Sequence, residues 1–191
     1  MAEVLRALRQ EHMDMSLLLD LMDRQIVHFQ HGARPDFDIV RGIIHYFLTY
    51  PDLYHHPKED LIVQQLRARV PEKAAELENL LTGHQDLAHL TRRFATAAID
   101  QMVRPDEVPR EWYGSLARDF VDTNRRHMAI EEERFFPMVL RTLTEEDWAA
   151  VNAHAAGSAD RLFGGKVESL YHTLRDAVLE LERSNTSSQQ S

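Results

Sequence analysis

Apolar residues recur every three or four positions along almost the whole chain, which is the period of an amphipathic helix. Glycine and proline, seven of each among 191 residues, interrupt this pattern mainly at 31–35, 70–71, 104–109 and 163–165. Alternating patterns typical of strands are nearly absent. The sequence therefore predicts long helices at 2–30, 37–69, 72–102 and 110–141, and shorter ones at 145–158 and 166–183.

The predicted helices indicate an all-α fold. Four long helices with short connections favour an antiparallel up-and-down four-helix bundle, with additional C-terminal helices. We expect one domain at 1–183, consisting of the bundle at about 2–141 and a helical extension at about 145–183, followed by a disordered polar tail at 184–191. Pro51 and Pro57 lie inside the second helix, and because proline lacks a backbone donor they predict a local distortion there.

Composition excludes several classes of partner and site. Acidic residues outnumber basic ones by 31 to 22, and the net charge of −9 disfavours nucleic acid and anionic membranes as partners. No apolar run approaches the roughly 18–20 residues of a membrane span, and we expect a cytoplasmic protein of undetermined oligomeric state. The chain has no cysteine, which excludes disulfides, cysteine-ligated zinc and iron–sulfur clusters. Any bound metal must therefore use histidine, carboxylate or tyrosine ligands.

Each long predicted helix carries one histidine on its apolar face. These are His12, His55, His84 and His127. The second and fourth helices also carry a glutamate one turn later, Glu59 and Glu131, and a spacing of four residues places both side chains on one face. The distance along the chain is 43 residues from the first histidine to the second and from the third to the fourth, and 72 residues between the two glutamates. One pattern of histidine and His-x-x-x-Glu thus occurs twice.

Two readings of this pattern compete. A single inward histidine is more often a hydrogen-bonded core residue than a ligand. A buried glutamate is rarer, because removing a carboxylate from water costs several kcal/mol unless it is paired or bound to a metal. The repeated pattern therefore favours a metal centre over a satisfied polar core. Four imidazoles and two carboxylates suit two iron or two manganese ions that share the carboxylates, whereas one zinc ion would need only three or four ligands.

The motifs around these residues resemble the hemerythrin-like family, also called HHE cation-binding domains. They are Glu11-His12, the segment 50–60 (Tyr-Pro-Asp-Leu-Tyr-His-His-Pro-Lys-Glu-Asp), Gly83-His84, and the segment 127–137 (His-Met-Ala-Ile-Glu-Glu-Glu-Arg-Phe-Phe-Pro). Residues 146–148 and 160–164 also resemble the segment that follows the bundle in bacterial members, so the similarity covers about 2–180. The resemblance implies a four-helix bundle with a non-haem di-iron centre. It further implies that the first two histidines bind one iron, the last two bind the other, and both glutamates bridge.

The ligand pattern differs from that of oxygen-carrying hemerythrins. Those use five histidines, with a His-x-x-x-His pair on the third helix and an aspartate on the fourth. Here Ala88 stands where the second histidine of that pair would be, and Glu131 replaces the later aspartate. The set of four histidines and two glutamates is similar instead to di-iron proteins associated with iron–sulfur cluster repair under nitrosative and oxidative stress.

Four further residues near the motifs have open roles. His56 has its own carboxylate one turn on, Asp60, but we expect it at the surface or behind the ligands. Glu132 is expected to be a solvated acid, with a shift onto the metal as the alternative. Tyr50 and Tyr54 are expected to pack in the core, with a hydrogen bond to a ligand or a bond to iron as the alternatives.

Three functions follow from these expectations. The first is a di-iron protein that binds or reduces a small oxidant, namely O₂, NO or peroxide, in a stress response. The second is iron storage or delivery to an iron-acceptor protein for iron–sulfur cluster repair. The third is an iron- or oxygen-sensing module in which metal loss loosens the bundle.

Overall fold

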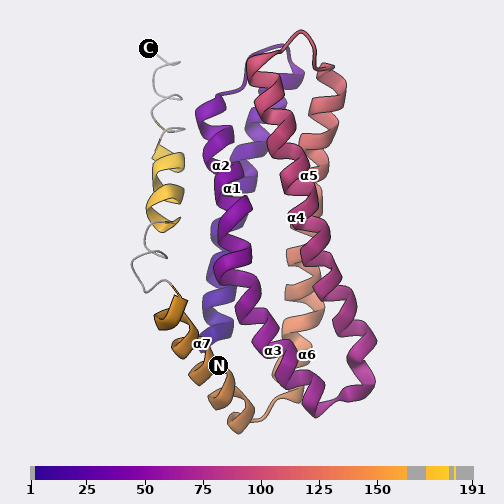
Figure 1. Ribbon diagram of the computed structural model, residues 1–191, viewed down its shortest axis with the longest axis vertical. Helices are drawn as coiled ribbons and strands as arrows, with labels where there is room; N and C mark the ends of the chain where they lie inside the picture. Colours follow the sequence, from indigo (N-terminus) through magenta and orange to yellow (C-terminus); the bar gives the residue numbers. More distant parts are fainter. Residues whose placement is uncertain (1–2, 163–170, 181–182, 184–191) are drawn as a thin grey trace.

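The computed structural model describes residues 3–162, 171–180 and 183, and its fold is an antiparallel four-helix bundle (Figure 1). The four rods of the bundle are, in chain order, α1 (Glu3–Gln30), α2 (Phe37–Tyr50) continued by α3 (His56–Arg69), α4 (Ala74–Val103), and α5 (Arg110–Ile130) continued by α6 (Phe136–Thr142). α1 and α4 each pack against α2 and α5, so neighbours in sequence are neighbours in space. The predicted all-α up-and-down bundle is confirmed.

The C-terminal part of the chain adds helices outside the bundle. α7 (Glu145–Leu162) lies across the end of the bundle where α1 begins, and residues 171–180 and 183 are also helical (Figure 1). The additional helices predicted at 145–158 and 166–183 are therefore present as far as the structure describes them, and the predicted tail at 184–191 lies outside the described residues. Among the described helices, none combines the length and apolarity that a bilayer crossing requires.

Two of the rods contain a single wide turn of π-helix. η1 (Pro51–His55) joins α2 to α3, and η3 (Glu131–Phe135) joins α5 to α6. In both, the residue before a proline donates its N–H to the carbonyl five positions back, because the proline itself has no N–H to continue the α-helical pattern. The distortion predicted in the second helix is confirmed. The matching one in the fourth was missed, although Pro137 is its sequence signal.

The apolar core is divided into two parts by a polar layer. The larger part is formed by the second half of α1, by α2 and by the facing stretches of α4 and α5, from Met15 to Met128. The smaller part lies at the other end, among the start of α1, α3, α6 and α7. Three of the four rods therefore run from one apolar cluster to the other, and the buried histidines and glutamates lie between the two clusters.

The helix at 171–180 packs on α1 and α2 through three kinds of contact. Arg175 forms an ion pair with the buried carboxylate of Asp14, Tyr171 packs edge-on against Tyr50 with ring centroids 5.4 Å apart, and Val178 is buried over α2. Gly42 makes this approach possible, because a Cβ atom there would stand 2.5 Å from Cγ2 of Val178.

Substituting Gly42→Ala should lower the melting temperature, although alanine is the better helix former. The gain in helix propensity is about 1 kcal/mol, whereas forcing a methyl group into a packed contact costs about 1–3 kcal/mol, and valine has few rotamers with which to move away. Thermal unfolding of the variant checks this. Adding Val178→Ala should restore the loss in part, and an unchanged melting temperature in the single variant would show that the helix moves without cost.

Candidate metal centre

The six side chains predicted to bind metal converge in the polar layer. α1 supplies one, the second rod two, α4 one and the fourth rod two; they are His12, His55, Glu59, His84, His127 and Glu131. Both glutamates have no exposed surface at all, and the histidines are buried or nearly so. The helical period turns each of these side chains inward, and the packing of the four rods then brings residues of α1 and η3 together.

Each glutamate faces one histidine pair with one oxygen and the other pair with its second oxygen. Oε1 of Glu59 lies 3.5 Å from Nε2 of His55, and its Oε2 lies 3.2 Å from Nε2 of His84. Glu131 repeats this arrangement, with Oε2 3.3 Å from Nε2 of His12 and Oε1 2.8 Å from Nε2 of His127. Two carboxylates oriented in this way have the donor arrangement of bridging ligands between two cation positions.

These ligand atoms are buried without the hydrogen bonds that buried polar atoms normally make. Both oxygens of Glu59 and of Glu131 lack a hydrogen-bond partner, as do Nε2 of His84 and of His127, since the short distances between them lack the required alignment. Their lone pairs instead face a shared space. Nε2 of His12 and of His55 are 3.1 Å apart, close to the separation of about 3 Å expected for two nitrogens bound at a right angle to one ion. The residues present therefore fit bound metal.

The electrostatics of the metal-free layer are unfavourable. Burial raises the pKa of Glu59 well above its usual range, and the neighbouring charge of Glu131 adds to this effect. Burial acts in the same direction on Glu131, but the surrounding imidazoles outweigh it and hold the pKa of that carboxyl well below its usual range. Burial also lowers the pKa of His55 to about 4. A neutral imidazole beside buried carboxylates is the protonation state that a metal ligand requires.

Two carboxylates outside the predicted set orient the first histidine pair. Nδ1 of His55 donates to Oε2 of Glu11 at 2.8 Å, and Nδ1 of His12 donates to Oε1 of Glu132 at 3.0 Å. Each carboxylate also forms an ion pair with a cationic side chain: Glu11 with Lys58, and Glu132 with Arg9. These bonds fix the tautomer that leaves Nε2 free to bind metal. Glu132, expected to be a solvated acid, is about one-third exposed and also accepts the bond from His12, a contact that the sequence did not indicate.

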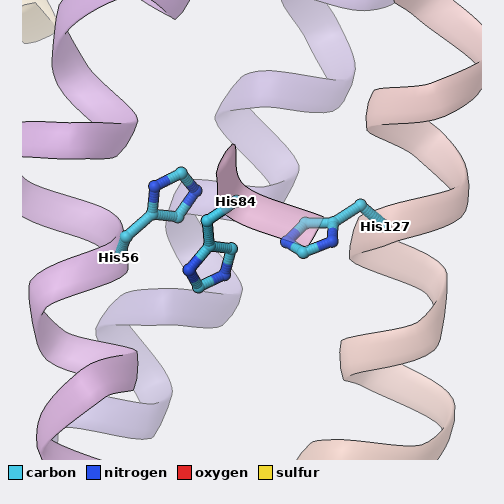
Figure 2. A group of neighbouring side chains, drawn as sticks. All are labelled: His56, His84 and His127. Carbon is cyan, nitrogen blue, oxygen red and sulfur yellow. The ribbon is translucent and has the colours of Figure 1, made fainter. Parts of the chain in front are cut away.

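His56 also lies in the polar layer, as Figure 2 shows from its position beside His84 and His127. Its ring stacks on that of His84 with centroids 3.9 Å apart, and its Nδ1 donates to Asp52 at 3.0 Å. One nitrogen from each of these three histidines lies within 4.8 Å of the others. His56 was expected either at the surface or behind the ligands. Its burial excludes the surface position and agrees with a position behind or beside the predicted ligands. The predicted core packing of Tyr50 is confirmed, since its side chain is buried.

A small cavity adjoins the layer on the side of the larger apolar cluster. Its volume is about 20 Å³, which is room for one water molecule. His55, His127 and Glu131 line it from the polar layer, and Ala88 and Thr91 line it from α4. The cavity thus extends from the polar layer to Ala88 on α4.

The bundle and its buried cluster of imidazoles and carboxylates define a cation-binding helical protein. A family model, the hemerythrin HHE cation-binding domain, matches residues 3–139. The chain belongs to this family, whose members bind metal, typically iron, and the cluster described here fits that function. Neither the search of curated proteins nor that of solved structures found a match.

Proposed function

We propose that the polar layer holds two iron ions, one at His12 and His55 and the other at His84 and His127. Glu59 and the second buried glutamate, Glu131, are the shared ligands. The observation that supports this is the orientation of the two carboxylates, each with one oxygen toward either histidine pair. Manganese is the alternative metal, since it accepts the same nitrogen and oxygen donors.

We further propose that the centre binds or reduces a small oxidant, namely O₂, NO or peroxide, in a stress response. Two imidazoles and two carboxylate oxygens give each ion about four protein ligands, and iron commonly takes six. When bound, an iron pair supplies electrons and open positions for such a ligand. The protein supplies the adjoining cavity of about 20 Å³, which has room for a ligand about the size of a water molecule next to the centre.

Metal analysis and rapid mixing test this function. Purified protein loaded with Fe²⁺ under anaerobic conditions should contain two irons per chain and, after oxidation, should show the near-ultraviolet absorption bands of a bridged ferric pair. Mixing the reduced protein separately with O₂, NO and hydrogen peroxide should change its spectrum with at least one of them. Two bound irons with no response to any of the three would contradict the oxidant function and leave the metal centre in place.

Filling the cavity should slow the reaction without removing the metal. Ala88→Leu places a larger apolar side chain in the space beside the centre, since Ala88 lines the cavity without being one of the six candidate ligands. We expect the rate of the spectral change on mixing to fall at least tenfold, with two irons retained. Thr91→Val, which keeps the cavity wall the same size, is the matched control. An equal rate in the leucine variant would show that oxidants reach the centre by another route.

Iron delivery for iron–sulfur cluster repair is the second candidate, in keeping with the four-histidine, two-glutamate pattern. The observation that favours it is the third nitrogen donor beside one ion position, His56. Reduced, loaded protein mixed with an iron-free acceptor protein should then lose iron within minutes. Retention of both irons under mild reduction and after addition of NO would contradict delivery.

A further inference from the structure

The two histidine pairs differ in whether a carboxylate accepts a hydrogen bond from Nδ1, the ring nitrogen that does not face the shared space. His12 and His55 both donate Nδ1 to a carboxylate, at 3.0 and 2.8 Å, and each of those carboxylates is itself held by a cation. A carboxylate behind a ligating imidazole increases its donor strength and fixes its orientation, and its loss typically reduces metal affinity about 10–100-fold. The ion position between these two histidines is therefore built for tight binding.

The other pair has no such support within the part of the chain that the structure describes. The ion pairs of His84 and His127 all involve Nε2 and the two shared glutamates, with no carboxylate at Nδ1. Behind His127 lies Gly83, whose missing side chain leaves room for the ring: a Cβ atom there would be 3.1 Å from Nδ1. The imidazoles of this pair are therefore weaker donors than those of the first pair.

A third nitrogen donor lies beside the weaker pair alone. The bond from Nδ1 of His56 to Asp52 leaves its Nε2 as an acceptor, and one nitrogen from each of His56, His84 and His127 lies within 4.8 Å of the others (Figure 2). Asp52 is half-exposed, whereas His56 is buried. Asp52, His56 and His127 line the same small cavity, so this cavity leads from the half-exposed carboxylate to the second ion position without passing through the His56 ring.

We propose that the ion position at His84 and His127 is the exchangeable one, and that His56 is the ligand through which it is loaded and emptied. The inference rests on the proposed two-iron centre. Binding to His56 lets a departing cation keep three nitrogen ligands while its bonds to Glu59 and Glu131 are released. The half-exposed Asp52 lines the same small cavity and is the next cation ligand on the way to solvent.

The surface groove between α1 and α5 does not provide an equivalent route to the first position. It is lined by Arg9, Met13 and Glu132 and ends on His12. The nitrogen of His12 that meets Glu132 is Nδ1, which already donates a hydrogen bond, while Nε2 faces the interior. A cation in the groove therefore meets the N–H of the ring rather than its lone pair.

A chelator chase tests the proposal on the full chain. Protein carrying two Fe²⁺ is mixed anaerobically with excess chromogenic Fe²⁺ chelator, and the released iron is followed with time. We expect two phases of one iron each, with rates at least tenfold apart. His56→Leu should slow the fast phase at least tenfold and leave the slow phase unchanged, and Glu11→Gln should accelerate only the slow phase.

Matched variants separate this role from general damage. His89 on α4 and Glu133 on η3 are exposed, so His89→Leu and Glu133→Gln should change neither phase. Asp52→Asn keeps His56 in place and should slow the fast phase as well, which serves as the test should His56→Leu fail to fold. A single phase releasing both irons, or a fast phase insensitive to both His56→Leu and Asp52→Asn, would overturn the proposal. Fewer than two irons before the chase would instead overturn the two-iron centre on which it rests.

Discussion

Substituting Glu59→Gln should make the metal-free protein more stable and, at the same time, remove its capacity to hold two ions. Glu59 is completely buried, carries no hydrogen bond on either oxygen, and lies close to a second buried carboxylate, Glu131. Burying a carboxylate costs several kcal/mol, so replacing it by a neutral group of the same shape should stabilise the metal-free protein by about 1–4 kcal/mol. For a chain of this size, that corresponds to a rise in melting temperature of several degrees.

The difference in stability between metal-free Glu59→Gln and the metal-free native chain should depend on pH, and the pKa of Glu59 gives the direction. Burial, with the charge of Glu131, raises the pKa of Glu59 above its ordinary value of 4.5 in the folded state. The stability that Glu59 contributes is therefore complete only below about pH 4.5 and is lost as the pH rises toward the folded-state pKa. Since glutamine does not titrate, the stability advantage of the metal-free variant should widen from pH 5 to pH 8. Urea unfolding across this range measures it.

Metal binding should respond in the opposite direction. Glu59 has an oxygen toward each histidine pair, so the substitution removes an anionic ligand from both ion positions, and iron content should fall from two per chain to one or none. Glu133→Gln, at an exposed position of η3, is the control and should change neither stability nor iron content. A Glu59→Gln variant that is less stable without metal would mean that this carboxylate is satisfied by the protein alone.

Removing iron from the native chain should lower its melting temperature by about 10 °C or more. A ligand that binds only the folded state stabilises it by about 4 kcal/mol when its free concentration is about a thousand times its dissociation constant, and each kcal/mol corresponds to about 2–4 °C in a protein of this length. Bound iron would also offset the burial of the Glu59 carboxylate and, after it, the neighbouring charge of Glu131, the two causes that raise the pKa of Glu59. Calorimetry of loaded and chelator-treated protein measures the difference.

Reloading provides the control for this second experiment. Adding Fe²⁺ to the chelator-treated protein should restore the higher melting temperature, whereas adding it to metal-free Glu59→Gln should restore little. Equal melting temperatures with and without iron would show that the polar layer is stable by itself, which is the satisfied polar core that the sequence alone leaves as the competing interpretation.

The sequence determined the bundle and the inward position of the six candidate ligands because both depend on local periodicity. A repeat of 3.6 residues places His55 and Glu59 on one face without knowledge of any other helix, and the same holds for His127 and Glu131. The apolar residues on either side of each ligand then require that face to be buried. For the same reason the break at Pro51 and Pro57 was foreseeable, since it follows from a missing backbone donor.

Only the tertiary structure decided which residues lie next to these ligands and which carboxylates accept hydrogen bonds from them. His55 ends η1 and His56 begins α3, and both are buried in the polar layer because other rods pack against both sides of this junction. The contacts from Glu11 to His55 and from Glu132 to His12 join separate rods of the bundle. Their existence depends on how the rods pack and rotate against one another, and helical periodicity along a single rod carries no information about that.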